Sequence, residues 1–147
     1  MAIRTVIDTN VLVSAVVKQH VFHERSFAVL ERVHDGKDAG FVSAHSLAEM
    51  YSVLTNLPTP YRHRPEQAWL SIEENVLKHF HAVALVGNEY ASLIRDAAGS
   101  QIQGSKIYDA LLLKAAGKAE VDRICTLNLK HFQSIASPGI SAKLSEP

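Results

Sequence analysis

The sequence has a single cysteine, Cys125, so an internal disulfide cannot form. This excludes a secreted fold stabilised by internal disulfide bonds, and it excludes any zinc site built from several cysteine thiolates. No apolar run approaches the roughly 20 residues that a membrane-spanning helix needs. The first seven residues carry one basic residue and no long apolar segment of the kind found in secretory signals. We therefore expect a cytoplasmic protein with no membrane part.

An excess of charge of one sign is also missing. Fifteen Lys and Arg residues balance fifteen Asp and Glu residues, so the formal net charge is zero. The overall basic character typical of nucleic-acid-binding proteins is therefore absent. A metal-dependent nuclease is still compatible with this balance, because clustered carboxylates in its site offset the basic residues around them. The hydrophobic fraction of 47% and the length of 147 residues are typical of one globular domain spanning residues 1–147.

Short apolar segments alternate with helical patterns along the chain. Strands are predicted at residues 3–7, 40–43, 81–86, 121–127 and 140–144. Helices are predicted over residues 11–17, 24–34, 45–57, 65–80, 89–98 and 106–118. Thr9 or Asn10 is expected to cap the first helix. This alternation predicts an α/β fold with a mostly parallel sheet of four or five strands.

Two aspartates stand out from this pattern. Asp8 follows the first strand, and ligand sites of open α/β sheets form at the carboxyl ends of the strands. Asp109 shares a helix face with Leu112 and Ala116, where an ionised carboxylate is costly unless a partner or a metal compensates it. A position near the helix N-terminus explains where Asp109 lies along the helix, but not the face it occupies. Both residues are candidates for a functional site.

Two further polar residues belong to the same candidate site. Glu49 lies at the border of the apolar stripe of the helix predicted over residues 45–57, and Asn128 follows the fourth strand. Taken alone, each has an ordinary explanation, since border acids are usually solvated and Asn is common in turns. Together with Asp8 and Asp109 they form an oxygen-rich set of the kind that binds Mg²⁺ and supports phosphodiester cleavage.

The order of these motifs resembles the PIN-domain family, and in particular VapC-type toxins. The resemblance begins with Ile7-Asp8-Thr9-Asn10-Val11-Leu12 and Leu47-Ala48-Glu49-Met50. It continues through Tyr108-Asp109-Ala110-Leu111-Leu112 and Thr126-Leu127-Asn128 with His131-Phe132, and closes with Pro138-Gly139-Ile140. It therefore spans the whole chain in the expected order. The fold it implies is a three-layer α/β/α arrangement.

The resemblance implies a toxin ribonuclease in which Asp8, Glu49 and Asp109 bind Mg²⁺, or alternatively Mn²⁺. A metal-activated water would cut RNA to leave 5′-phosphate and 3′-hydroxyl ends. It also implies a cognate antitoxin and a homodimer. Asn128 departs from the family, because many members have Asp there. An amide oxygen can still bind or orient a water, but it adds no negative charge, so a second metal is expected to bind more weakly.

Other residues remain open to more than one interpretation. Two interpretations are open for Phe22, Phe27 and Trp69. They either line an antitoxin groove or belong to the hydrophobic core, and their residue type favours the core. A contact with RNA phosphates is a hypothesis for the basic residues Arg62, Arg64, Lys106 and Lys130. Such charges are more often simply solvated.

Other functional classes fit less well. The histidine pairs His20/His23 and His79/His81 suggest zinc, but neither has a clear third ligand. There is no Gly-x-Ser-x-Gly turn for a serine nucleophile. An aspartyl-nucleophile phosphatase needs a second Asp where Asn10 stands, and a receiver domain needs a different layout of acids. The main alternative is a PIN-like RNA-binding or scaffolding domain that has lost its activity, an interpretation that Asn128 leaves open.

Overall fold

A computed structural model describes residues 2–147 and contains one five-stranded sheet whose paired strands are all parallel. The strands are β1 (Ile3–Ile7), β2 (Asp38–Ser43), β3 (Phe80–Val83), β4 (Arg123–Cys125) and β5 (Leu144–Ser145). Their order across the sheet is β3-β2-β1-β4-β5. Val6 at the centre pairs with Phe41 of β2 and Ile124 of β4. The predicted parallel α/β sheet is confirmed.

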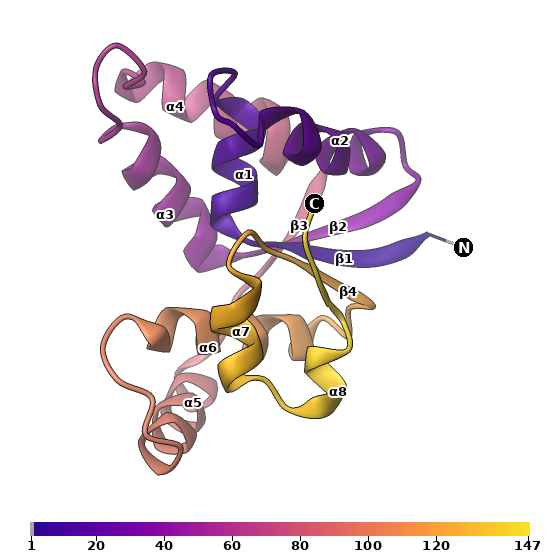
Figure 1. Ribbon diagram of the computed structural model, residues 1–147, viewed down its shortest axis with the longest axis vertical. Coiled ribbons are helices and arrows are strands. Elements are labelled where there is room, and N and C mark those ends of the chain that lie inside the picture. The colour runs from indigo at the N-terminus through magenta and orange to yellow at the C-terminus, as the bar shows by residue number, and fades with distance from the viewer. Residues whose placement is uncertain (1) are drawn as a thin grey trace.

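Helices cover both faces of this sheet (Figure 1). They are α1 (Thr9–Val16), α2 (His23–His34), α3 (Ala44–Leu54), α4 (Pro65–Ile72), α5 (Gly87–Gly99), α6 (Lys106–Lys118), α7 (Leu129–Ile135) and α8 (Pro138–Ser141). A π-helical turn, Glu73–Leu77, extends α4. In Figure 1, α1 to α4 lie above the sheet and α5 to α8 lie below it, which gives the predicted three layers. None of the helices within residues 2–147 is long and apolar enough to span a bilayer.

Alternating residues of β1 supply the two main hydrophobic clusters. Ile7 packs with Val11 and Leu12 of α1 in one cluster, and Val6 packs with Leu112 of α6 in the other. Successive side chains of a strand point to opposite faces, so a sheet covered on both sides needs apolar residues at consecutive positions. This is why Val6 and Ile7, at consecutive positions of the central strand, are both apolar and fully buried.

The direction of winding reverses between β1 and β4. From β1 the chain passes outward to β2 and then to β3, and it later returns to place β4 on the opposite side of β1. The loops after β1 and β4 therefore leave the sheet in opposite directions, and a crevice forms between them at the carboxyl ends of these strands. Ile7 pairs with Cys125 at this end, so Asp8 and Thr126 follow two adjacent strands.

Two predictions about local structure were wrong, and one short helix was missed. Asp8 caps α1, rather than Thr9 or Asn10, because its side chain accepts a hydrogen bond from the Thr9 backbone. The short helix α7 was not predicted. The segment predicted as a strand at 140–144 instead begins in α8, which Pro138 starts and Ser137 caps through the Ile140 backbone N–H. The fifth strand exists, but it lies at Leu144–Ser145.

The interpretation of the aromatic residues as core was also wrong. Trp69 is 50% exposed and Phe27 is 37% exposed, while Phe22 is half-buried. In α2 the buried face is formed by Ser26, Val29, Leu30 and Val33, which places Phe27 to one side of it. These aromatic side chains therefore contribute to the surface, as the groove interpretation requires.

Gly40 of β2 offers a test of how tightly the upper layer packs on the sheet. A methyl group there would lie 2.5 Å from the Phe80 ring and 2.6 Å from the Val33 side chain. We expect Gly40→Ala to lower the free energy of unfolding by about 1–3 kcal/mol, because an overpacked core must shift. Chemical denaturation followed by circular dichroism measures this change.

Gly117→Ala is the matched control, because a methyl group at this α6 position meets nothing within 4 Å. There the same substitution should raise stability by up to about 1 kcal/mol through helix propensity. Two variants of equal stability would contradict the packing described for Gly40.

Candidate functional site

A cavity of about 380 Å³ lies at the crevice between β1 and β4. Its lining contains both polar and apolar side chains and consists of Asp8, Thr9, Asn10, Val13, His20, Glu49, Val53, Leu57, Asp109 and Asn128. All four residues predicted from the sequence for the site line this one cavity. They come from the ends of β1 and β4 and from helices α3 and α6, which lie in opposite layers (Figure 1).

Asp8 is the best anchored of these side chains. Its Oδ1 accepts a hydrogen bond from the Thr9 backbone at 2.8 Å, and its Oδ2 accepts one from the Thr126 hydroxyl at 2.8 Å. The same carboxylate thus caps α1 and connects α1 to the end of β4. Burial raises the pKa of Asp8 to about 6, although the bonds from Thr126 and Thr9 lower it; repulsion from Asp109 and Glu49 adds to the rise.

Glu49 and Asp109 complete the acidic side of the cavity. Thr9 donates its hydroxyl to Glu49 Oε1 at 3.0 Å, and His45 Nε2 lies 3.6 Å from the same oxygen. Burial raises the pKa of Asp109, while the nearby charge of His131 lowers it, Glu49 raises it and Lys106 lowers it. The acids therefore repel one another across the cavity, and a bound cation would relieve this repulsion.

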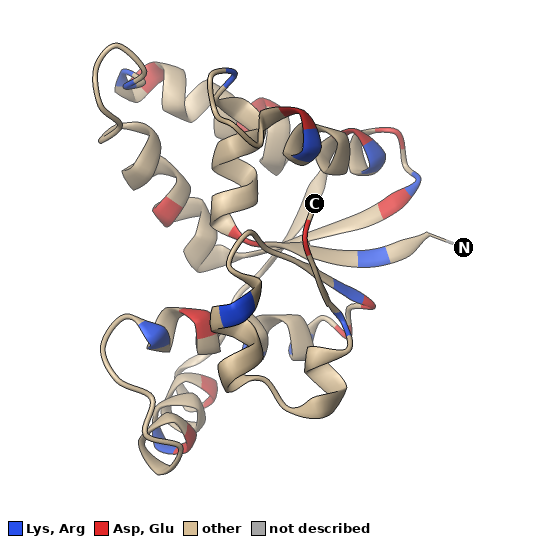
Figure 2. Cartoon of the chain, viewed as in Figure 1, with Lys and Arg blue, Asp and Glu red and all other residues tan. Residues whose placement is uncertain are grey.

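Figure 2 shows acidic positions on α3 and α6 on either side of the gap between the upper and lower layers. Basic positions lie at the start of α6 and on α7, on the lower side of the same gap. Although the chain has no net charge, its charges are thus unevenly distributed around the cavity. Net charge alone therefore does not describe the electrostatics of this site.

Two residues have roles that the sequence did not reveal. Thr126 donates to Asp8 and also accepts a hydrogen bond from the Asn128 backbone at 3.0 Å. Asn10 accepts one from the Leu127 backbone at 3.2 Å through its side-chain oxygen. Thr126 joins the loop after β4 to Asp8, and Asn10 joins the start of α1 to the same loop. A signal was present, since each is a polar residue within three positions of a predicted strand end.

The donor set suits a hard divalent cation. Asp8, Glu49 and Asp109 line the cavity together with Asn128, so its polar lining residues include three carboxylates and an amide. Within residues 2–147, no three Asp, Glu, His or Cys side chains lie close enough to enclose an ion by themselves. Mg²⁺ usually keeps several waters and uses one or two carboxylates plus substrate phosphate, so it needs no such enclosure. The catalytic and metal-binding roles of the four residues stay predictions.

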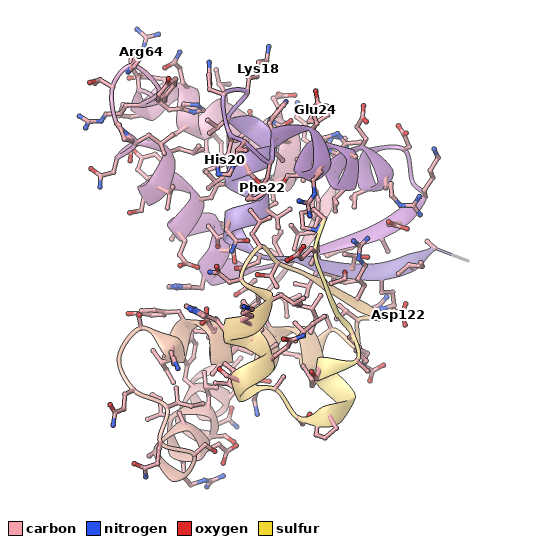
Figure 3. All side chains as sticks on the ribbon, viewed as in Figure 1. Lys18, His20, Phe22, Glu24, Arg64 and Asp122 are labelled. Carbon is pink, nitrogen blue, oxygen red and sulfur yellow. The ribbon has the colours of Figure 1, made fainter. Side chains whose placement is uncertain are left out.

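The histidine pairs do not assemble into a zinc site. His20 Nδ1 accepts a hydrogen bond from the Phe22 backbone at 3.1 Å, in the loop labelled in Figure 3. His79 packs against His34 with ring centroids 4.0 Å apart and planes tilted by 30°, and His81 packs against Phe41 with a tilt of 35°. Both pairs therefore have ordinary structural partners.

The basic loop lies away from the acids. Arg64 is at the top of Figure 3, beyond the end of α3 that is distant from α6. The Arg62 guanidinium donates to the Leu57 carbonyl at 2.8 Å. Lys106 is better placed, because its charge acts on Asp109. Contact between any of these residues and RNA stays a prediction.

Comparison with known proteins places this site in a family. Residues 4–130 match the family model of the PIN domain. The chain belongs to the PIN-domain family. Ribonuclease VapC40 of Mycobacterium tuberculosis is 34% identical to it over 114 residues, which cover 75% of this chain and 78% of that protein.

Solved structures share the fold. The VapC20 structure from Mycobacterium tuberculosis, described as a sarcin–ricin loop cleaving toxin, has a TM-score of 0.68 at 10% identity and covers 90% of this chain and 96% of its own. VapBC2 of Rickettsia felis, bound to a promoter DNA fragment, has a TM-score of 0.66 at 19% identity over 98% of both chains. Together with the family match and VapC40, these similarities confirm the predicted PIN fold and the predicted class of enzyme, a VapC-type endoribonuclease.

The pKa of Asp8 predicts an unusual effect of Asp8→Asn on stability. Its pKa is about 6 in the folded protein, against an ordinary value of 3.8, so the folded state binds the proton more tightly. The ionised carboxylate therefore costs stability above pH 6, and this cost disappears as the pH falls through 6 towards 3.8. We expect Asp8→Asn, which can still cap α1, to raise the metal-free free energy of unfolding by about 2 kcal/mol at pH 8. The gain should be largely lost near pH 4.

Urea denaturation in EDTA at several pH values measures this gain. Asp96→Asn, which removes an exposed carboxylate from α5, is the matched control and should show little change. Added Mg²⁺ should stabilise the wild type and not Asp8→Asn. A gain in stability that is independent of pH would contradict the burial of an ionised Asp8.

Thr126 can be tested by removing only its hydroxyl group. Thr126→Val leaves Asp8 Oδ2 and the Asn128 backbone without this partner, so we expect a loss of about 1–3 kcal/mol in stability. Thr126→Ser keeps the hydroxyl and should retain most of that stability. Thermal denaturation of the two variants distinguishes these cases, and a Thr126→Val variant as stable as the wild type would contradict the stabilising role of the hydroxyl.

Proposed function

We propose that this chain is the toxin of a toxin–antitoxin pair, and that it hydrolyses RNA phosphodiester bonds with the help of Mg²⁺. The observation that carries the proposal is the convergence of Asp8, Glu49 and Asp109 on one cavity, although they come from β1, α3 and α6. Three acids from separate elements are electrostatically unfavourable as a purely structural arrangement. The PIN-domain relatives named as VapC ribonucleases support the proposed reaction.

The acids of the cavity and the residues that hold them have distinct parts in the proposed mechanism. A divalent cation, when bound, supplies an activated water and neutralises charge on the phosphate. Asp8, Glu49 and Asp109 would hold it. Thr126 and the Thr9 backbone keep the Asp8 carboxylate in one orientation, and the Thr9 hydroxyl does the same for Glu49. These bonds reduce the reorganisation needed when cation and substrate bind.

Asn128 limits the negative charge of the cavity. It lines the cavity with a neutral side chain, and its backbone is held by Thr126. We propose that a second cation binds weakly here and is completed by substrate phosphate. The same residue supports a second candidate function, an RNA-binding domain with little or no activity.

The proposed partners are an RNA substrate and an antitoxin protein, both encountered in the cytoplasm. The VapBC2 structure of Rickettsia felis supports the antitoxin. Phe27 and Trp69 are exposed and Phe22 is half-buried, as residues of an antitoxin groove would be. A homodimer stays a prediction.

The decisive experiment incubates the purified protein with total cellular RNA in Mg²⁺, in Mn²⁺ and in EDTA. We expect discrete RNA fragments that depend on the metal. The Asp8→Asn/Asp109→Asn double variant should cut more slowly by on the order of 100-fold or more, because it removes two proposed metal ligands. Gel electrophoresis and end-sequencing of the fragments measure rate and cleavage position.

The Asp96→Asn variant controls for loss of a carboxylate elsewhere and should cut at the wild-type rate. Cleavage that persists in EDTA and in the double variant would point to a contaminating nuclease. Folded wild-type protein that binds RNA without cutting it in either metal would favour the inactive RNA-binding domain.

A further inference from the structure

Two aromatic rings stack beside the acidic cavity, and neither has a part in the mechanism above. Tyr108 of α6 and His45 of α3 have ring centroids 5.0 Å apart and planes only 6° from parallel. Within residues 2–147, Tyr108 is the only tyrosine stacked on another ring. The pair joins two helices from opposite layers of the fold, across the gap seen in Figure 1.

The helices that supply two of the acids also place these rings. Tyr108 immediately precedes Asp109, and His45 lies one helical turn before Glu49, with its Nε2 3.6 Å from Glu49 Oε1. The rings are thus within one helical turn of the proposed metal ligands. The pair therefore lies beside the acids at which the scissile phosphate is proposed to bind.

Tyr108 is more exposed to solvent than is usual for an aromatic residue whose only role is to pack against another ring. The residue is 49% exposed, whereas the His45 side chain is 30% exposed. No hydrogen bond of the Tyr108 hydroxyl is present within residues 2–147. Tyr108 is therefore the outer ring, supported from behind by His45, with much of its surface available to solvent. Burial of a hydrophobic side chain does not explain its position.

An exposed, fixed aromatic ring beside a phosphodiester site suits an unpaired nucleobase. Each base has a flat π face, and stacking on an aromatic side chain is a main source of affinity for single-stranded RNA. A base in a duplex has both faces covered by its neighbours and cannot stack in this way. Because His45 already holds the ring, little conformational freedom is lost on binding. The charge of Lys106 near Asp109 would favour the adjoining phosphate.

We propose that Tyr108, backed by His45, is the platform on which an unpaired base next to the scissile phosphate stacks. This inference rests on the proposed function and narrows its substrate to single-stranded or looped RNA. Tyr108 binds the substrate, and His45 is a positioning residue that orients the Tyr108 ring. Stacking is tolerant of base identity, so the platform selects for unpaired structure rather than for sequence.

The test measures RNA binding without cleavage, in EDTA, with Asp8→Asn as the background. The probe is a short single-stranded RNA in which each adenine is replaced by 2-aminopurine, whose fluorescence falls when it stacks. We expect Tyr108→Leu in this background to weaken binding by about 5- to 100-fold and to remove most of the quenching. Tyr108→Phe keeps the ring, so its RNA affinity and its fluorescence quenching should both stay within about two-fold of those of the background protein. Tyr90→Leu, an exposed tyrosine on α5 outside the cavity, is the matched control.

A second probe separates stacking from a general effect on the fold. An abasic oligomer of the same length has the same phosphates and no bases, so Tyr108→Leu should bind it as the Asp8→Asn background does. Thermal denaturation of Tyr108→Leu and Tyr108→Phe confirms that both are folded. The base-bearing RNA annealed to its complement should bind the background protein more weakly than the single strand does.

Three results would overturn the proposal. The first is that Tyr108→Leu and Tyr108→Phe bind the base-bearing RNA with equal affinity. The second is that Tyr108→Leu loses as much affinity for the abasic oligomer as for the base-bearing RNA. The third is that the background protein does not quench the 2-aminopurine fluorescence. The outcome is independent of catalysis, because the binding is measured without metal and with an altered Asp8. A failure of metal-dependent cleavage by the wild type would count against the proposed function, whereas a failure here would count against the platform alone.

Discussion

The carboxylate of Asp8, held between α1 and β4, is the constraint on which the site depends. Its two oxygens accept hydrogen bonds from the Thr9 backbone and from the Thr126 hydroxyl. These bonds compensate part of the cost of burial, but not all of it, because the pKa of Asp8 still rises to about 6. The fold therefore keeps a buried acid whose charge is only partly compensated, and this is an expected property of a site that binds a cation.

The parallel sheet determines where this acid can be useful. Because β1 is central and the winding reverses between β1 and β4, the crevice at the carboxyl ends of these strands opens beside Asp8. Helix α3 brings Glu49 to the crevice from one layer, and helix α6 brings Asp109 from the other. The stacked pair of His45 and Tyr108 joins the same two helices. Metal binding and base stacking are thus proposed for neighbouring parts of one crevice.

The local pattern of apolar and polar residues predicted the long helices and the central strand well, and it predicted the short elements near the end of the chain poorly. The strand at residues 3–7 was apparent because it is rich in β-branched residues and ends in the consecutive apolar pair Val6 and Ile7, which suits a sheet covered on both faces. The short helix at Leu129–Ile135 buries only Phe132, so it has no repeating apolar stripe to detect. The segment at residues 140–144 was predicted as a strand, but Pro138 and the Ser137 cap start a helix there. Trp69 reads as core by residue type, although it is 50% exposed.

The sequence by itself determined which residue types were unusual in their setting. Asp8 after an apolar strand and Asp109 on an apolar helix face were recognisable because buried charge is costly wherever the chain folds. Glu49 was not distinctive alone, and Thr126 and Tyr108 had no assigned role. Their importance comes from contacts between residues about 40 to 120 positions apart in the chain, such as Thr9 with Glu49 and Asp8 with Thr126. Only tertiary structure decides such contacts, because strand order and helix packing, rather than local spacing, bring these side chains together.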